Sequence, residues 1–321
     1  MATAFFLTGL ASVEVHALQT FENAHQDGDR TDPDASAILK LMIQTKADPT
    51  KAGRCSAFFV SNTAGRPYIA SARHCADYEF TEACAAGRLN LTTQVGGHKA
   101  KCKSVIVGDL ENDLVIFEAS FEKPWAEVRK SISFLTLSSQ LPRHNTRLKM
   151  LGYQGGNRNG EFTITDNCWV NSGRPVSTQD LLADELSKNN DFRATVVTNP
   201  LAGRIRNNLV AYHNCSIYGG NSGGPILREG TKIVLGLPTS YFPGSQRPKS
   251  SSLSAAMDST AYIVLPYAQK LKAAGIRFAK AYGDTPEPSF YQVKKATDGY
   301  DYCFLRLAPA GSLPVDPSLC N

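Results

Sequence analysis

The octapeptide Gly219-Gly220-Asn221-Ser222-Gly223-Gly224-Pro225-Ile226 places one serine between two pairs of glycines. Glycine accepts backbone angles that a Cβ atom forbids, so this stretch can turn sharply and expose both a hydroxyl and main-chain N–H groups. An acyl-transfer nucleophile needs both features, because N–H donors must face the oxyanion that forms during the reaction. Stretches rich in glycine and serine are also common in ordinary turns. Ser222 is therefore a candidate nucleophile if the chain also supplies a base and an acid.

A candidate base and a candidate acid each stand at the end of an apolar run. His74 follows the apolar residues 67–72 and precedes Cys75. Asp113 stands at the head of the strand-like residues 114–119. In serine hydrolases, a histidine takes the proton from the serine hydroxyl, and a carboxylate orients the imidazole of that histidine.

In this order, the segments around His74, Asp113 and Ser222 resemble the trypsin/chymotrypsin-like serine proteases, and Gly-Asn-Ser-Gly-Gly resembles the bacterial members. Leu-Gly-Tyr at residues 151–153 is similar to a further element of that family. The resemblance extends over residues 37–282. It implies an all-β fold of two six-stranded antiparallel Greek-key barrels with a C-terminal helix. Residues 283–321 extend beyond the family's usual end, and we expect them to form a short tail closed by a disulfide.

The resemblance implies a catalytic triad and an oxyanion hole. Ser222 is the expected nucleophile, His74 the general base, and Asp113 the carboxylate that holds the imidazole. Histidine has an ordinary pKa of about 6.5, which suits a group that takes and returns a proton near neutral pH. The main-chain N–H groups of Gly220 and Ser222 are the expected oxyanion donors.

Three other residues are alternatives for the base and the acid. His213 lies shortly before Ser222, on a strand that leads to the serine loop, where a histidine is more often structural. Asp109 and Glu111 lie close to Asp113 in the sequence. Only Asp113 directly precedes an apolar run, where the head of a strand can bury a carboxylate beside the histidine.

The resemblance also indicates the pocket for P1, the substrate residue on the N-terminal side of the cleaved bond. We align the residues before Ser222, and the strand that follows it in the sequence, with the corresponding segments of the family. This alignment gives the pocket residues Ser216, Ile217, Thr239, Ser240 and Tyr241. Trypsin-like members carry Asp at the position of Ser216, so we expect no counter-ion for Arg or Lys. Pro238 stands where glutamyl endopeptidases carry His. These positions predict a neutral P1 residue.

Two positions depart from the trypsin-like pattern. Asn221 replaces the Asp that receives a new N-terminal ammonium in trypsin-like zymogens, and an amide carries no charge for that ion pair. Activation by insertion of a new N-terminus is therefore not expected, whereas removal of a propeptide remains open. Arg73 stands where the family favours Ala, and we expect its side chain to point outward.

Length, charge and composition place the chain in a broad class. It has 321 residues, a net charge of +5 and 42% hydrophobic residues, which supports one or two packed domains rather than disorder. The charge is mixed and too small to indicate binding of nucleic acid. No Cys-x-x-Cys pair and no His-Glu-x-x-His sequence occurs, so we expect no metal ion and no cofactor.

Eight cysteines, an even number, favour disulfides formed in an oxidising compartment. The resemblance implies a bridge between Cys55 and Cys75. Proximity in the sequence suggests the further pairs Cys84–Cys102, Cys168–Cys215 and Cys303–Cys320. We therefore expect a secreted or periplasmic protein.

The chain divides into four expected segments. Residues 1–17 have a short apolar core and a small-x-small end, so we expect a secretory signal peptide that is too short to cross a bilayer. Residues 18–36 are polar and are expected to be a propeptide or a flexible lead-in. The protease domain is expected over residues 37–282, with barrels near 40–125 and 146–265 and a helix at 266–282. Residues 283–321 are a C-terminal extension.

Short apolar runs between Gly and Pro residues predict many short strands rather than alternating strands and helices. We expect strands within residues 55–60, 67–72, 101–107, 114–119, 147–151, 161–165, 194–198, 209–213, 225–227, 233–237 and 261–265. Residues 37–44 are a strand or a short helix, and residues 238–259 are a Ser- and Pro-rich loop.

These observations predict a secreted serine endopeptidase that hydrolyses peptide bonds through an acyl-enzyme intermediate. The alternative is a catalytically inactive protease homologue that acts as a protein-binding module, because a fold alone does not fix a function. Inactive homologues usually lose a triad residue, and none is missing here. We expect protein or peptide substrates, no nucleic-acid partner, no stable membrane insertion and a monomer.

Overall fold

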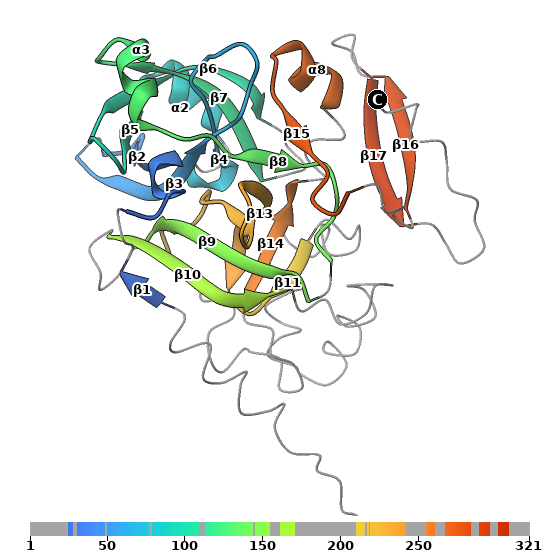
Figure 1. Cartoon of the computed structure of the whole chain (residues 1–321). Helices are drawn as coiled ribbons and strands as arrows, with labels where there is room; N and C mark the ends of the chain where they lie inside the picture. Colours follow the sequence, from blue (N-terminus) through green and yellow to red (C-terminus); the bar gives the residue numbers. More distant parts are fainter. Residues whose placement is uncertain are drawn as a thin grey trace, which may run out of the picture.

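The computed structural model describes residues 25–27, 31–48, 50–76, 79–108, 113–143, 145–154, 161–170, 210–215, 217, 219–241, 255–260, 267–283, 289–295 and 301–307. This part of the chain is mostly β, with a few short helices. Figure 1 shows a barrel from the first half of the chain packed on a second sheet, with a small hairpin near the C-terminus to one side.

Six strands close into an antiparallel barrel in the order β2-β3-β4-β7-β6-β5. Period-two burial shows why these residues form strands: along β5, Leu89, Leu91 and Thr93 are buried and the residues between them are partly exposed. The predicted six-stranded antiparallel barrel is confirmed, although the sequence analysis did not single out β5. The strands are β2 Ile38–Gln44, β3 Ala52–Phe59, β4 Tyr68–Ala72, β5 Leu89–Thr93, β6 Lys99–Gly108 and β7 Leu114–Phe121.

Aromatic side chains fill the barrel and hold the helices that cover it. The helix α2 (Phe80–Ala85) places Phe80 against Phe117, with 5.2 Å between the ring centroids. A disulfide between Cys84 and Cys102 joins α2 to β6. Burying one such side chain stabilises the fold by about 1.5–3 kcal/mol. Other short helices are η1 Ala35–Ala37, α3 Trp125–Val128 and η3 Arg129–Ser131.

The second half of the chain forms a nine-stranded sheet around the path β1-β10-β9-β12-β13-β14-β11. Its core is antiparallel, while β8 lies parallel to both β13 and β15. Where a second six-stranded antiparallel barrel was predicted, the described residues form a mainly antiparallel sheet that also includes short parallel strands. The strands are β1 His25–Asp27, β8 Thr136–Ser138, β9 Arg147–Tyr153, β10 Phe162–Trp169, β11 Val210–His213, β12 Ile226–Arg228, β13 Ile233–Tyr241, β14 Ala255–Ser259 and β15 Phe278–Ala279.

One apolar cluster joins the barrel to the second sheet. It contains Phe58 and Leu114 from the barrel together with Leu151 and Leu237 from the sheet, and all four are buried. Because the two units share this core, the end of the barrel that carries His74 is fixed against the sheet that leads to Ser222.

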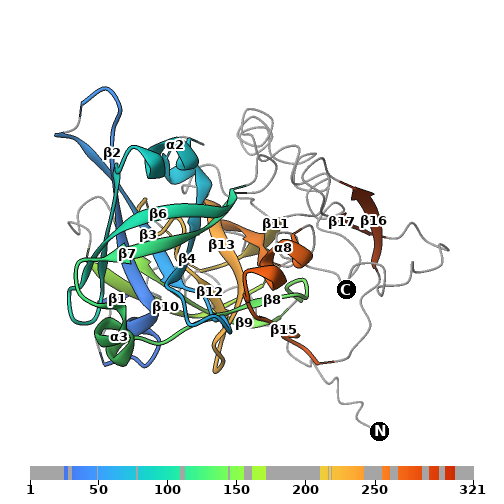
Figure 2. The same cartoon turned by 90° about the horizontal axis from the view of Figure 1, so that it is seen from above.

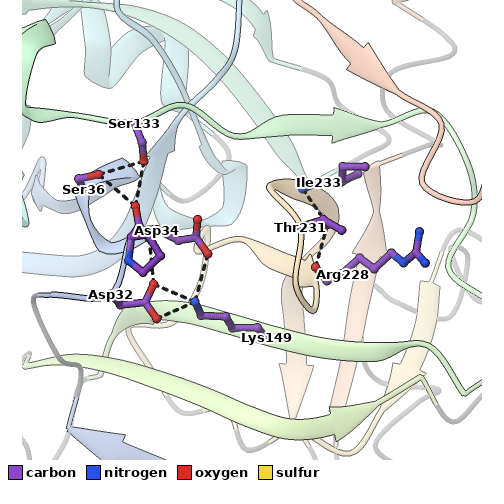
Figure 3. Close-up of polar contacts among 9 residues, drawn as sticks. Asp32, Asp34, Ser36, Ser133, Lys149, Arg228, Thr231 and Ile233 are labelled. Atoms are coloured by element: carbon purple, nitrogen blue, oxygen red, sulfur yellow. Dashed lines mark hydrogen bonds and ion pairs between the residues drawn. The ribbon is translucent and has the colours of Figure 1, made fainter.

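The N-terminal segment, residues 25–27 and 31–37, is part of the second unit. Strand β1 pairs with β10. Figure 3 shows the ammonium of Lys149, on β9, between two carboxylates, 2.6 Å from Asp32 and 3.1 Å from Asp34. Ser36 adds a hydrogen bond of 2.9 Å to Ser133. The described parts of the region expected to be a propeptide or lead-in, residues 25–27 and 31–36, thus contact the folded core.

Two predictions about the second half are wrong in detail. The helix expected at residues 266–282 is the shorter α8 (Ala268–Ala273), because Gly275 has φ +77°, a conformation that ends helices, and residues 278–279 pair with β8. The loop expected at 238–259 is strand at both ends, since β13 continues to Tyr241 and β14 begins at Ala255. The expected segments 1–17, 194–198 and 261–265 lie outside the described residues.

The C-terminal extension contains an antiparallel hairpin that the sequence analysis did not predict. Strands β16 (Ser289–Lys295) and β17 (Asp301–Leu307) pair along their whole length. β17 contacts α8, and Figure 2 shows the hairpin on the side of α8 that faces away from the barrel. Cys303 lies in β17, but its expected partner Cys320 lies outside the described residues. None of the helices in the described part of the chain has the length and apolar character needed to cross a bilayer.

Candidate active site

His74 lies in a single 3-10 turn, η2 Arg73–Ala76, directly after β4. The disulfide Cys55–Cys75 links this turn to β3 and is the bridge that the family resemblance implied. The His74 side chain is 28% exposed. The imidazole is therefore held by the barrel and remains partly accessible.

Asp113 holds the histidine from the neighbouring strand. Pairing of β4 with β7 sets Ala72 opposite Leu114, so the end of one strand meets the head of the other. The Asp113 side chain is 3% exposed; its Oδ1 accepts the main-chain N–H of His74 at 2.7 Å, and its Oδ2 is hydrogen-bonded to Nδ1. A carboxylate accepts hydrogen bonds, so a neutral imidazole in this position carries its proton on Nδ1.

Ser222 lies in the loop between β11 and β12. Gly220 and Gly223 have φ of +97° and +79°, which side-chain-bearing residues rarely adopt. The N–H of Gly224 donates to the carbonyl of Asn221 at 2.8 Å and closes the turn. The carbonyl oxygen of Ser222 lies 3.8 Å from Sγ of Cys75, the residue next to His74. The structure thus brings the two motifs, which are far apart in the sequence, to one place.

The absence of a side chain at Gly223 lets the serine loop approach the barrel closely. A Cβ atom at this position would come 2.6 Å from the main-chain nitrogen of Ala72 and would clash with Ser71 and Ser56. These neighbours belong to β3 and β4, the strands that carry Cys55 and lead to His74. The glycine after Ser222 therefore lets the serine loop lie directly against the strand that leads to His74.

The expected oxyanion donors lie in the same loop. The main-chain N–H groups of Gly220 and Ser222 have no hydrogen-bond acceptor among the described residues. No described group therefore competes with a substrate carbonyl for these two donors.

The alternative residues for the base and the acid have other surroundings. His213 is fully buried in β11, and its Nδ1 accepts the N–H of Cys215 at 3.2 Å, beside the Cys168–Cys215 disulfide. This placement fits a structural role in the second sheet. Asp109 and Glu111 lie outside the described residues.

The structure describes the expected substrate pocket only in part. Ser216 lies outside the described residues, whereas Ile217 is 5% exposed and belongs to the apolar core of the second sheet. Thr239, Ser240 and Tyr241 form the end of β13. The strand expected to form the pocket wall is therefore present, while Ile217 lies among core side chains.

One expectation about the barrel side of the site is wrong, and one contributor was missed. Arg73 is 7% exposed, so it is buried rather than directed outward. Ser56, which follows Cys55 on β3, was not singled out, although its N–H donates to the carbonyl of Ser222 at 2.8 Å. No cluster of three or more His, Cys, Asp or Glu side chains that could hold a metal ion occurs among the described residues.

Comparison with known proteins agrees with the architecture. The model of the trypsin-like peptidase domain matches residues 55–237, which is more than half of the chain. A search of curated proteins finds no match. Among solved structures, the scabies mite inactivated protease paralogue S-D1 is similar over 79% of this chain and 98% of its own, with 13% identity and a TM-score of 0.50.

A second solved structure, named HL collagenase, is similar over 76% of this chain and 95% of its own, with 14% identity and a TM-score of 0.50. At such identities the structural similarity concerns the fold alone, and the two relatives include one protein described as inactivated. The family model, the closed barrel with its second sheet, and the paired segments around His74, Asp113 and Ser222 lead to one conclusion: this chain belongs to the trypsin-like peptidase family.

Proposed function

We propose that this protein is a serine endopeptidase in which Ser222, His74 and Asp113 form the catalytic triad. One observation carries the proposal: the Asp113 carboxylate binds both the main-chain N–H and Nδ1 of His74, while the adjacent Cys75 lies 3.8 Å from the Ser222 carbonyl. The family membership supports peptide bonds as the substrate.

The reaction would use each of these groups in turn. The Ser222 hydroxyl attacks the scissile carbonyl and gives its proton to Nε2 of His74, while the N–H groups of Gly220 and Ser222 bind the oxyanion. The C–N bond then breaks, and the imidazolium returns the proton to the leaving amine. Water attacks the Ser222 ester through the same base and releases the acid. Asp113 keeps the imidazole oriented throughout.

We propose a neutral P1 preference, an extracellular or periplasmic location and a monomeric protein. The expected pocket residue Ser216 carries no charge, and Pro238 is not a hydrogen-bond donor. The disulfides Cys55–Cys75, Cys84–Cys102 and Cys168–Cys215 are consistent with an oxidising compartment. Residues 1–17 would be the signal peptide. We also propose that the segment from residue 25 onward stays in the mature protein, because it pairs with β10 and with Lys149.

Labelling with a fluorophosphonate tests the proposal and separates it from the inactive, protein-binding alternative. The mature wild-type protein should gain one phosphonyl group on Ser222, located by peptide mass spectrometry, and Ser222→Ala should gain none. Labelling at another serine, or no labelling of correctly processed protein, would favour the binding module. A peptide library then reads the P1 preference, and strong cleavage after Arg or Lys would refute a neutral pocket.

A further inference from the structure

Ser56 occupies a position between the barrel, the second sheet and the serine loop. It lies on β3, directly after Cys55, and is fully buried. Strand β3 contacts β9 of the second sheet at this point (Figure 1). A buried hydroxyl must find partners, so the contacts of Ser56 show what holds these three parts together.

The Ser56 hydroxyl links the second sheet to the oxyanion loop. Its oxygen accepts the main-chain N–H of Tyr153, on β9, at 2.8 Å. Its proton is donated to the carbonyl of Gly220 at 2.8 Å. Because a hydroxyl has a single proton, these two bonds define the direction in which it points.

The side chain of Ser56 binds the first residue of the tripeptide 220–222, and its main chain binds the last. Its N–H donates to the carbonyl of Ser222 at 2.8 Å. The carbonyls of Gly220 and Ser222 are therefore both held by one residue. A peptide unit is planar, so fixing a carbonyl fixes the whole plane to which it belongs. The N–H of Ser222 lies in the peptide unit between two fixed planes, and the N–H of Gly220 is separated from a fixed plane by the two backbone rotations at Gly220.

Glycines leave the room that this side chain needs. A Cβ atom at Gly152 would come 2.7 Å from Oγ of Ser56, and one at Gly224 would come 3.2 Å from its Cβ. Both approaches are tighter than ordinary van der Waals contacts. The Leu-Gly-Tyr element and the second glycine pair of the serine loop thus form a fitted site for Ser56.

Asn221 completes the link without any charge. It is fully buried, and its Nδ2 donates to the carbonyl of Tyr153 at 3.4 Å. Tyr153 therefore holds the loop through both of its main-chain groups, by its N–H through Ser56 and by its carbonyl through Asn221. This network uses neutral hydrogen bonds where an ion pair with a new N-terminus is excluded by the amide at residue 221.

We propose that Ser56 is a positioning residue whose hydroxyl holds the oxyanion donors Gly220 and Ser222 in their catalytic geometry, so that this loop is formed without N-terminal insertion. The role rests on the proposed peptidase function. It goes beyond the triad, because Ser56 touches neither the imidazole nor the expected substrate.

Ser138 provides a matched control. It is also fully buried; its hydroxyl donates to the carbonyl of Gln140 at 2.8 Å and accepts the N–H of the same residue at 3.0 Å. Ser56→Ala and Ser138→Ala thus each remove a buried hydroxyl that uses one N–H and one carbonyl. They differ in that only Ser56 is bonded to the serine loop.

The test compares both variants with the wild type in reaction with diisopropyl fluorophosphate. For Ser56→Ala we expect the first-order rate of serine phosphorylation, with loss of fluoride, at saturating reagent to fall about 10–100-fold, because displaced donors no longer stabilise the developing charge. The half-saturating concentration should stay within about twofold, since the loss falls on the transition state. Ser138→Ala should lose a similar amount of thermal stability and keep the wild-type rate. A Ser56→Ala rate within about twofold of the wild type would overturn the proposal.

Amide hydrogen exchange of the peptide covering residues 219–224 provides a readout that needs no activity. Ser56→Ala should exchange faster there than Ser138→Ala and the wild type, and equal exchange would also overturn the proposal. If diisopropyl fluorophosphate does not modify the wild type, the peptidase function fails, and the exchange result still decides whether Ser56 holds the loop. If Ser56→Ala does not fold, Ser56→Gly removes the same hydroxyl and is measured in its place.

Discussion

The closed barrel and the second sheet are assembled from the chain in different ways. The barrel uses six strands between Ile38 and Phe121, most of them joined by short connections. The second sheet gathers strands from His25 to Ala279, including two parallel pairings between remote segments. The barrel holds His74 and Asp113, and the sheet leads to Ser222. The catalytic site that we propose therefore depends on docking a locally built unit against one that is built from distant parts.

The largest expected effect tests whether residues from the two units act together. His74→Ala on the barrel side and Ser222→Ala on the sheet side should each lower kcat for peptide hydrolysis by about 10⁴–10⁶-fold. The double variant should be no slower than either single variant, because neither group works without the other. Steady-state kinetics with a peptide from the library measures this. If the loss of kcat in the double variant equals the product of the two single losses, the two residues act independently, and the barrel and the sheet do not form one site.

The disulfides should stabilise the two units by different amounts. Loops of 20 residues for Cys55–Cys75 and 47 for Cys168–Cys215 predict losses of about 3 and about 4 kcal/mol when each pair is replaced by alanine. The midpoint of urea unfolding measures both. Removing Cys55–Cys75 should in addition lower kcat, since this bridge holds the turn of His74.

The Cys84–Cys102 bridge serves as the control for that activity loss. Its separation of 18 residues predicts nearly the same loss of stability, about 3 kcal/mol, without a contact to His74 or to the serine loop. Equal kcat in the Cys55–Cys75 and Cys84–Cys102 variants, below their unfolding transitions, would show that the bridge beside His74 only stabilises the barrel.

Close approach of the serine loop to strand β4 depends on Gly223. Gly223→Ala puts a methyl group against Ala72 at 2.6 Å and imposes a φ of +79° on an alanine, so we expect kcat to fall by about 10²-fold or more. Gly219→Ala is the matched control, since a Cβ there meets no atom within 4 Å. Equal activity of both variants would mean that the loop does not need this close contact.

The smallest effect concerns the N-terminal segment. Burial by itself lowers the pKa of Lys149, but hydrogen bonds from its ammonium to Asp32 and Asp34 outweigh this and raise the pKa above its ordinary value of 10.5. Because the folded-state pKa is raised, the stabilisation is fully present below the unfolded-state pKa and is lost as the pH rises through the folded value. Lys149→Met should therefore cost about 1–2 kcal/mol at neutral pH, and less in strong alkali.

A lysine of the barrel whose side chain is mostly exposed provides the comparison for Lys149; its partner Glu118 is buried and also pairs with Arg66 at 3.3 Å. Lys103 pairs with Glu118 at 3.0 Å, and its side chain is 57% exposed compared with 17% for Lys149. Lys103→Met should cost less than about 1 kcal/mol. Thermal unfolding at neutral pH measures both variants. Equal losses would mean that the N-terminal segment contributes no more than an ordinary surface ion pair.

The sequence predicted most of the barrel and the pairing of His74 with Asp113, because these depend on apolar runs and motifs that are visible locally. It did not predict β1, since His25–Asp27 is short and polar and is a strand only because β10 supplies an edge. β14 was missed for a related reason: its small residues lie in a Ser-rich stretch, and the pairing with β13 decides their conformation. Remote partners, not local propensity, determine these elements.

The contribution of Ser56 was also beyond the reach of a sequence pattern. A serine after a cysteine has no distinctive signal, and its partners Tyr153 and Gly220 lie 97 and 164 residues away. The Leu-Gly-Tyr element was noted in the sequence, but its contacts with Ser56 are visible only in the structure. Gly152 leaves space for the Ser56 hydroxyl, and the N–H of Tyr153 donates to it.

The most direct test of the account is a crystal structure of the protein after reaction with a peptidyl boronate. We predict a bond from boron to Oγ of Ser222, Nε2 of His74 within hydrogen-bond reach of the adduct, and one boronate oxygen about 2.7–3.1 Å from the main-chain nitrogens of Gly220 and Ser222. A boronate bound to another residue, or a Ser222 adduct that the barrel-borne His74 does not reach, would contradict the claim that the two units form one catalytic site.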